Sequence, residues 1–223
     1  EKERKLAEFN TEESFKEYDM FWDRFFKVIE KMTSYAEQKI EYISATQIGG
    51  DLNIIPIQVR KDLEITDAVG KPKLGYNVIE LMYAIENFLG WNNTTEAFLV
   101  GAGNLGSALL GYNGFKEYGL NIIAAFDIDE NKVGTTVEGK MIFNINKLTD
   151  MIRRMGIKIG IITTPPGNAQ EVTDIMIDAG ICAIWNFSHT KINVPTGVIV
   201  QHENLASSLV VLSKKLAMFL QAN

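Results

Sequence analysis

Residues 96–130 have the sequence EAFLVGAGNLGSALLGYNGFKEYGLNIIAAFDIDE, and this stretch decides the fold. A short apolar run at residues 97–100 is typical of a buried strand, and leucines at helical spacing follow the glycines. A second apolar run, at residues 122–126, ends in Asp127. The stretch therefore predicts a strand, a glycine turn, a helix and a second strand.

Three glycines stand at Gly101, Gly103 and Gly106, with the spacing Gly-X-Gly-X-X-Gly. The first permits a tight turn, the second lets the backbone approach a pyrophosphate, and the third lets the helix pack closely on the sheet. The N–H groups at the helix start then face the anion. Asp127 follows about 20 residues later, where a carboxylate can accept both hydroxyls of an adenosine ribose. The pattern predicts a site for NAD(H) rather than NADP(H), because Asp127 repels a 2′-phosphate; a purely structural glycine turn is the alternative.

The composition is that of a globular protein without an intrachain disulfide. Of the 223 residues, 46% are hydrophobic, which is enough for one large or two small domains. No apolar run approaches the ~20 residues of a membrane span, and no signal peptide is visible. Cys182 is the only cysteine, which excludes an intrachain disulfide, and its apolar surroundings in the sequence predict a buried thiol. We expect a cytoplasmic protein, and with a net charge of -6 any nucleic-acid-binding surface has to be local.

Residues 44–76 have the pattern of a winged helix-turn-helix, preceded by an amphipathic helix that is expected to end near Met32. Ser44 can cap a short helix that Gly49 and Gly50 would end, and Pro56 suits the first turn of a second helix. Two short helices joined by a turn match a helix-turn-helix, and residues 69–76 can form a wing hairpin.

The second of these helices has an apolar and a polar face, with Ile55, Val59 and Leu63 expected inside. The candidate DNA contacts are Gln58 for base edges, Arg60, Lys61, Lys71 and Lys73 for phosphates, and Ser44 at the start of the first helix. Charged helix faces are commonly only solvated, and residues 1–92 carry more acidic than basic side chains. From these residues alone, a DNA-binding domain and a solvated helix pair both stay open.

Strand and helix patterns alternate after the glycine turn. Apolar runs at residues 157–163 and 181–187 are separated by helical patterns, which predicts a mostly parallel, doubly wound sheet. Ligands of such sheets lie beyond the carboxyl ends of the strands, at the switch point. This rule places five more residues on the ligand-binding rim: Thr163, Thr164, Pro165, Asn186 and Phe187.

The last helix, at residues 205–220, is apolar on most of its circumference. A terminal helix of this kind needs cover on most sides, and a second subunit is the simplest source. The pattern therefore predicts a homodimer.

No pattern of side chains for catalysis accompanies the rim. A hydride-transferring enzyme needs a general acid or base beside the nicotinamide, and usually a second domain for its substrate. His189 and His202 are the only histidines, and neither a metal cluster nor a nucleophile motif is visible. We therefore expect no catalytic residue and no metal, and a protein that reports the state of its cofactor. The alternatives are an NAD-dependent oxidoreductase or CoA-binding protein without DNA binding, and a dinucleotide-binding protein that acts through a protein partner.

Several linked motifs resemble the Rex family of redox-sensing transcriptional repressors. They are QVRKDL at residues 58–63, GAGNLG at 101–106, AFDID at 125–129, TTP at 163–165 and NF at 186–187, in this order. The resemblance extends from about Ser44 to Leu220. It implies a homodimeric repressor that binds double-stranded operator DNA in the presence of NAD⁺ and is released by NADH. The implied domains are a winged helix at residues 1–92, a Rossmann domain at 93–203 and a dimerisation helix at 204–223, exchanged between subunits.

The resemblance also implies a cofactor site. Asp127 would hold the ribose on the adenine side, while Tyr112 and Phe187 would lie beside the nicotinamide. The full set predicted for NAD(H) is Gly101, Ala102, Gly103, Asn104, Leu105, Gly106, Tyr112, Asp127, Lys132, Thr163, Thr164, Pro165, Asn186 and Phe187.

The chain departs from the family pattern at three places. Asn204 stands where the family has an aspartate at the start of the terminal helix, and Lys27 stands nearest to the arginine with which that aspartate pairs. After the second helix, EITD at residues 64–67 replaces the family's SYFG, so Glu64 and Asp67 are expected near phosphates, where they weaken DNA binding. These departures predict altered DNA affinity or an altered response to NADH.

Overall fold

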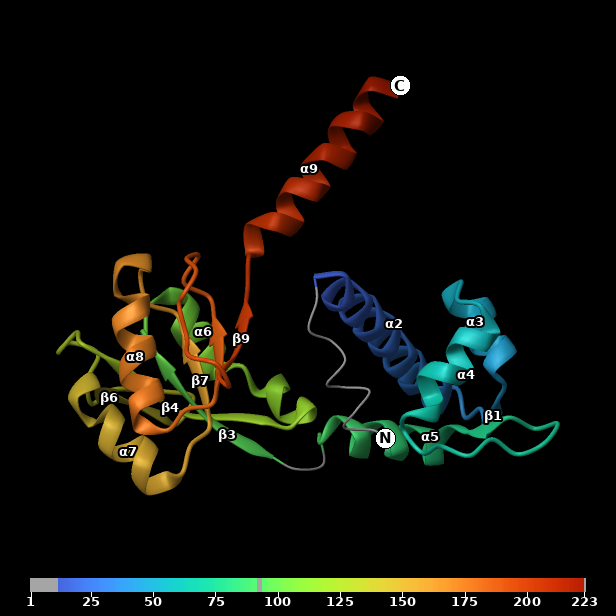
Figure 1. Ribbon diagram of the computed structural model, residues 1–223, viewed down its shortest axis with the longest axis horizontal. Coiled ribbons are helices and arrows are strands. Elements are labelled where there is room, and N and C mark those ends of the chain that lie inside the picture. Colours follow the sequence, from blue (N-terminus) through green and yellow to red (C-terminus); the bar gives the residue numbers. More distant parts are fainter. Residues whose placement is uncertain (1–11, 92–93, 223) are drawn as a thin grey trace. The chain divides into compact units, whose positions relative to one another are not determined.

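The structure is a computed structural model that describes residues 12–91 and 94–222 (Figure 1). The chain divides into two compact units, Glu1–Asn93 and Thr94–Asn223. Among the described residues, no helix combines the length and the apolar character that a membrane crossing requires.

The N-terminal unit consists of helices around one core, with a two-stranded sheet. Its elements are α2 (Glu12–Glu37), β1 (Tyr42–Ile43), α3 (Ala45–Leu52), α4 (Pro56–Glu64), β2 (Tyr76–Asn77) and α5 (Val78–Leu89). Each helix contributes fully buried side chains to this core, among them Phe25 and Met32 of α2, Ile48 of α3, Leu63 of α4 and Ile85 of α5. Strands β1 and β2 pair antiparallel, and a bridge between Lys71 and Gly75 closes the wing. Helix α2 ends five residues beyond the expected Met32 because Tyr35, one turn farther on, is also buried.

Helix α3 begins as predicted but ends later than predicted. The Ser44 hydroxyl accepts a hydrogen bond from the Gln47 N–H, and the Gln47 side chain accepts one from the Ser44 N–H, which completes a capping box. The expectation that Gly49 and Gly50 end this helix is wrong. Gly49 lies inside it because a Cβ there would stand 2.4 Å from the Ile54 carbonyl oxygen, and Asn53, with φ 54°, takes the left-handed position instead.

Helix α4 starts with Pro56 in its first turn, as predicted. Its inner face consists of Val59, Asp62 and Leu63. Ile55 was expected on this face but is 72% exposed, because it precedes the helix as its N-cap in an extended conformation. The carboxylate of Asp62 is buried on this face, although the apolar periodicity predicts only apolar residues there.

The second unit is a seven-stranded sheet with helices on both faces. Its strands are β3 (Thr95–Val100), β4 (Leu120–Asp127), β5 (Thr136–Val137), β6 (Lys140–Asn144), β7 (Ile159–Ile162), β8 (Ala183–Asn186) and β9 (Ile199–His202), in the order β5-β6-β4-β3-β7-β8-β9. All neighbours are parallel except β5 and β6. The six parallel strands thus follow the order 3-2-1-4-5-6 of a Rossmann fold, which confirms the predicted doubly wound sheet.

The helical segments of this unit are α6 (Asn104–Gly111), η1 (Asn113–Tyr118), η2 (Ile145–Lys147), α7 (Leu148–Met155), η3 (Pro166–Asn168), α8 (Ala169–Ala179) and α9 (Leu205–Ala222). Alternate residues of β3 point to opposite faces of the sheet. Phe98 joins the core under α7 and α8, whereas Leu99 joins the core under α6. The switch point lies at β3, because β4 continues to one side of it and β7 to the other.

Two features at the surface of this unit bear on the predictions. Cys182 is exposed, so the prediction of a buried thiol is wrong. Ile181 and Cys182 precede β8, and of the two only Ile181 is buried in the core. The described apolar side chains of α9 are exposed, with Leu209, Leu212 and Leu220 each above 60%.

Candidate functional site

The glycine turn between β3 and α6 brings backbone segments into close contact. Gly101 has φ +102°, and a Cβ at Gly106 would stand 1.9 Å from the Gly101 carbonyl oxygen and 2.8 Å from the Thr163 hydroxyl. A Cβ at Gly103 would instead meet no atom within 4 Å. Gly101 and Gly106 therefore hold the turn against the sheet, while Gly103 leaves open space in front of the start of α6.

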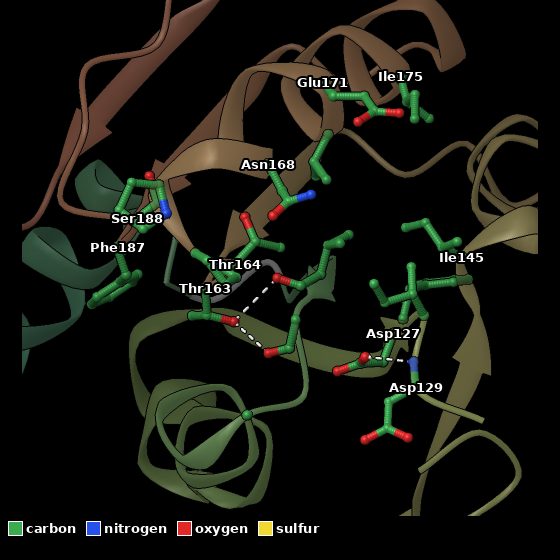
Figure 2. Close-up of a pocket in the computed structure, with 18 of the residues that line it drawn as sticks. Asp127, Asp129, Ile145, Thr163, Thr164, Asn168, Glu171, Ile175, Phe187 and Ser188 are labelled. Carbon is green, nitrogen blue, oxygen red and sulfur yellow. Dashed lines mark hydrogen bonds between the residues drawn. The ribbon is translucent and has the colours of Figure 1, made fainter. Parts of the chain in front are cut away.

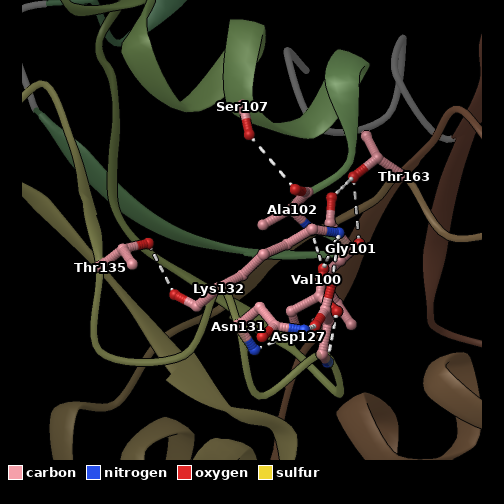
Figure 3. A network of polar contacts seen from close by, with 10 residues as sticks. Val100, Gly101, Ala102, Ser107, Asp127, Asn131, Lys132, Thr135 and Thr163 are labelled. Atoms are coloured by element: carbon pink, nitrogen blue, oxygen red, sulfur yellow. Dashed lines mark hydrogen bonds and ion pairs between the residues drawn. The ribbon is translucent and has the colours of Figure 1, made fainter.

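Asp127, the last residue of β4, faces this turn (Figure 3). Its carboxylate accepts hydrogen bonds from the Ala102 N–H at 2.7 Å and from the Asp129 N–H at 2.9 Å. The Lys132 ammonium lies 3.5 Å from this carboxylate and 3.5 Å from that of Asp129. The two backbone bonds fix the Asp127 carboxylate beside the loop, so its orientation is set before any ligand binds.

Asp129 is a second carboxylate on this rim, and the sequence pattern does not predict its place there. Hydrogen bonds from the backbone and side-chain N–H groups of Asn131 lower its pKa below the ordinary value, and Lys132 adds to the effect. Both carboxylates share one lysine. The rim therefore keeps an excess of negative charge, which disfavours a 2′-phosphate.

The two threonines after β7 have different roles. The Thr163 hydroxyl lies 2.6 Å from the Gly101 carbonyl oxygen and 3.1 Å from that of Val100, so it ties β7 to the glycine turn (Figure 3). The Thr164 hydroxyl is buried and has no partner among the described residues. A buried hydroxyl without a partner is costly, and Thr164 is among the residues that line the cavity described next.

A cavity of about 950 Å³ opens at the carboxyl ends of the central strands (Figure 2). Nine residues of the predicted NAD(H) set line it: Gly101, Gly103, Leu105, Asp127, Lys132, Thr163, Thr164, Pro165 and Phe187. Apolar side chains of η2 and α8 line the cavity as well, namely Ile145 of η2 and Val172 and Ile175 of α8. The cavity joins the turn to this apolar region, which suits one of the two planar bases of a dinucleotide.

The other five residues of that set do not line the cavity. Ala102 donates its N–H to Asp127, Asn104 is exposed in the first turn of α6, and Gly106 is buried against the turn. Asn186 is buried and orders the following loop: its Oδ1 accepts from the Ser188 N–H and hydroxyl, and its Nδ2 donates to the Thr190 carbonyl. Tyr112 is 55% exposed, beyond the end of α6.

A series of aromatic rings connects Tyr112 with the cavity. Ring centroids are 4.9 Å apart between Tyr112 and Phe115, 5.5 Å between Phe115 and Trp185, and 4.8 Å between Trp185 and Phe187. Phe187 ends the series at the cavity wall. Phe115 and Trp185 were not predicted, because their spacing along the chain gives no sign that they share a cluster.

Several residues that line the cavity were not predicted from the sequence, among them Ile145, Asn168, Glu171 and Ser188 (Figure 2). Glu171, in the first turn of α8, adds another acidic side chain to the wall. The rule that ligands lie beyond the carboxyl ends of parallel strands points to these loops, but it does not identify the side chains within them.

The cavity wall also includes a histidine. His189 lines it, as an exposed residue with φ +56°. Within the described ranges, His, Cys, Asp and Glu side chains form no group of three that could hold a metal ion.

The candidate DNA contacts all lie in the N-terminal unit. Arg60 and Lys61 are exposed on α4, whereas Gln58 is half-buried and donates from Nε2 to Asp62 Oδ1 at 2.7 Å. Lys73 is exposed in the wing and has φ 65°. Ser44 caps α3.

Lys71 is also exposed in the wing, but its ammonium group already has a partner in its own unit. It donates to the Tyr42 hydroxyl at 2.9 Å and lies 5.0 Å from the centre of that ring. The hydrogen bond to Tyr42 raises the pKa of Lys71 above its ordinary value. Lys71 therefore remains a cation held close to the base of the wing.

Comparison with known proteins identifies relatives over most of the chain. The family model of the CoA binding domain matches residues 92–190. The redox-sensing transcriptional repressor Rex of Treponema denticola is 51% identical over 174 residues, which cover 78% of this chain and 83% of that protein. The repressor of the same name from Bacteroides fragilis is 41% identical over 175 residues, with 78% and 80% covered.

Solved structures give the same result. The Rex-family repressor RSP in complex with β-NAD⁺ and operator DNA superposes with a TM-score of 0.83 at 30% identity, covering 91% of this chain and 95% of that one. RSP in complex with β-NADH gives 0.80 at 29% identity, with 92% and 97% covered. The resemblance inferred from the motifs is thereby confirmed, and the chain belongs to the Rex family of redox-sensing transcriptional repressors.

Proposed function

We propose that this protein is an NAD(H)-sensing transcriptional repressor, which binds operator DNA as a homodimer when NADH is low and leaves the DNA when NADH binds. The observation that carries the proposal is the cavity formed by the glycine turn and Asp127, in the same chain as a winged helix-turn-helix. The named relatives are repressors, and the solved relative RSP binds β-NAD⁺ with operator DNA and, separately, β-NADH. As such a repressor it would act in the cytoplasm.

The residues present fit NAD(H). Gly103 leaves space for the pyrophosphate before α6, the Asp127 carboxylate is held where it can accept from ribose hydroxyls, and the buried Thr164 hydroxyl lacks a partner among the described residues. When bound, the cofactor supplies a nicotinamide whose oxidation state is the signal. The protein binds and orients it.

The proposed division of labour assigns residues 1–92 to DNA, 93–203 to the cofactor and 204–223 to dimerisation. The exposed apolar side chains of α9 support the last assignment, because a second copy of the chain would cover them. Exchange of α9 between subunits, as the family resemblance implies, is part of this proposal.

The test is DNA binding under cofactor control. A recognition sequence is first selected from a library of random duplexes with the full chain and NAD⁺, and affinity for it is then measured by fluorescence anisotropy with NAD⁺, NADH or NADPH. We expect tight binding with NAD⁺, at least about tenfold weaker binding with NADH, and no such effect of NADPH at equal concentration.

Failure of the chain to prefer any sequence, with either cofactor, would contradict the repressor function. Steady oxidation of NADH with a small carbonyl substrate would instead support the alternative of an oxidoreductase.

A further inference from the structure

The buried carboxylate of Asp62 connects the N-terminal helix with the exposed face of α4. Its side chain is 5% exposed. Oδ2 accepts a hydrogen bond from Arg24 Nε at 3.0 Å, and Oδ1 accepts one from Arg24 Nη2 at 3.3 Å. Oδ1 also accepts from Gln58 Nε2 at 2.7 Å. The carboxylate is therefore held by α2 on one side and holds Gln58 on the other.

This contact determines which way the Gln58 amide points. A carboxylate paired with a guanidinium group offers only acceptors, so Gln58 has to present its NH₂ group and not its carbonyl oxygen to Asp62. Among the described residues, no donor reaches Gln58 Oε1. The acceptor Oε1 and the second N–H of the amide remain for a ligand.

The remaining edge of the amide is complementary to one base. Adenine presents a donor, N6–H, beside an acceptor, N7, in the major groove, and glutamine can bond to both at once. Guanine presents two acceptors there, so Oε1 would oppose one of them. If the amide were flipped by 180°, its oxygen would face N7 of adenine, and two acceptors would oppose each other. The hydrogen bond from Gln58 Nε2 to Asp62 prevents this flip before DNA binds.

We propose that Arg24 and Asp62 are positioning residues that fix the Gln58 amide for recognition of adenine in the operator. The proposal rests on the proposed function, because it requires α4 to enter the major groove with its first turns at the base edges. Gln58 lies in the first turn of α4, and Asp62 lies one turn later on the same helix. The pair of Arg24 and Asp62 is charge-assisted and largely shielded from water, so it holds its geometry better than an exposed pair.

The experiment measures discrimination between bases by the full chain with NAD⁺. Each A·T pair of the selected duplex is replaced in turn, and binding is measured for the parent chain, Gln58→Ala and Asp62→Asn. We expect the parent to lose roughly ten- to hundredfold affinity at one pair of each half-site. Gln58→Ala and Asp62→Asn should both reduce that loss to about twofold or less, while affinity for a random duplex stays within about twofold.

The matched control is Glu64→Gln. Glu64 is an exposed acid on the same helix, so its removal deletes the same charge without touching the Gln58 amide. This variant should strengthen binding to all duplexes alike and leave discrimination unchanged. Arg24→Gln provides a second route if Asp62→Asn does not fold, because Arg24 is 27% exposed and the variant keeps both Asp62 and Gln58. It should lose part of the discrimination.

The outcomes separate this inference from the proposed function. A parent chain without any sequence preference would remove the repressor function itself. Full discrimination in the folded Asp62→Asn or Arg24→Gln variant, at the pair that Gln58→Ala affects, would overturn the positioning role. An equal loss of affinity for every duplex, including the random one, would also overturn it, because that result indicates damage to the domain.

Discussion

In the dinucleotide unit the glycine turn shapes one edge of the cavity through its backbone, whereas in the N-terminal unit every candidate contact with DNA is a side chain. The glycine turn packs so closely that a Cβ at Gly106 would collide with the Gly101 carbonyl, but one at Gly103 would meet open space. On α4, by contrast, Arg60 and Lys61 extend from an ordinary helix. The first site depends in part on the absence of side chains at the glycines of the turn, whereas the second depends on the charged and polar groups of side chains.

A buried carboxylate prepares each site, in a different way. Asp127 accepts N–H groups of the backbone, from Ala102 and Asp129, so the loop itself fixes it. Asp62, among the described residues, accepts from two side chains, Arg24 and Gln58. Substitution of Gly106 should therefore change stability and cofactor affinity together, whereas substitution of Gln58, which donates to Asp62, should change specificity with little change in the fold.

The largest effect is expected for Gly106→Ala. The added methyl group would stand 1.9 Å from the Gly101 carbonyl oxygen, so the turn or α6 has to move away from the sheet. We expect a loss of stability of about 1–3 kcal/mol, from overpacking, and loss of measurable NADH binding. Thermal unfolding and calorimetric titration check the two results.

Gly103→Ala is the matched control for this variant. Its methyl group meets no atom within 4 Å, and its φ of -74° suits alanine. Stability should change by no more than about 0.5 kcal/mol, while NADH affinity falls because the methyl group occupies the approach of the pyrophosphate. Wild-type NADH affinity in Gly106→Ala would show that the tight turn is not needed for binding.

The same contrast explains how far the sequence alone predicts this molecule. Gly101 and Gly106 are needed for close contacts of the backbone, and Asp127 follows them at a recognisable spacing. The strand, turn and helix predicted from this pattern are all present. The parallel sheet followed from the alternation of apolar runs. Both predictions rest on local rules that tertiary packing leaves intact.

The predictions that failed depend on packing between elements. Gly49 was expected to end a helix but lies within it, because its missing Cβ makes room for the Ile54 carbonyl. Ile55 is exposed because it precedes α4 as its N-cap. Asp62 is buried because Arg24 of α2, far away in the sequence, pairs with its carboxylate. Similarly, Ile145 of η2 and Glu171 of α8 reach the cavity only because the assembled sheet places the starts of these helices at its edge.

Asp127→Ala is expected to have the next largest effect. It removes a buried carboxylate that two N–H groups and Lys132 orient, and hydrogen bonds to charged groups contribute about 1.5–3 kcal/mol. NADH affinity should fall roughly ten- to hundredfold, and the preference over NADPH should shrink because the negative charge near the ribose is reduced. Calorimetric titration with both cofactors measures the change.

Asp150→Ala serves as the control for charge, because Asp150 is an exposed carboxylate on α7 that pairs with Arg154 outside the cavity. Its cofactor affinities should equal those of the parent chain. A parent chain that binds NADPH as tightly as NADH would contradict the role assigned to Asp127.

Arg60→Ala tests the side-chain surface and should act on DNA alone. Loss of one phosphate contact should weaken binding to all duplexes alike and reduce the slope of log affinity against log salt concentration by about one. NADH binding should not change. The control is Arg154→Ala, which removes an exposed arginine from the dinucleotide unit. An unchanged salt slope in Arg60→Ala would place the phosphate contacts elsewhere on the unit.

The smallest effect is expected for Asn204→Asp, at the start of α9. The Asn204 Oδ1 accepts a hydrogen bond from the Ala206 N–H at 3.1 Å, and aspartate can keep this cap while adding a negative charge at the helix N-terminus. The family resemblance gives an aspartate here the task of pairing with a cation of the DNA-binding domain when NADH is bound. In this variant NADH should weaken DNA binding about fivefold more than in the parent chain, for a charged contact of about 1 kcal/mol.

Asn204→Ser keeps a capping oxygen without the charge and should respond to NADH as the parent chain does. Equal responses in the two variants, measured by anisotropy over a range of NADH concentrations, would mean that the charge at this position does not transmit the redox signal.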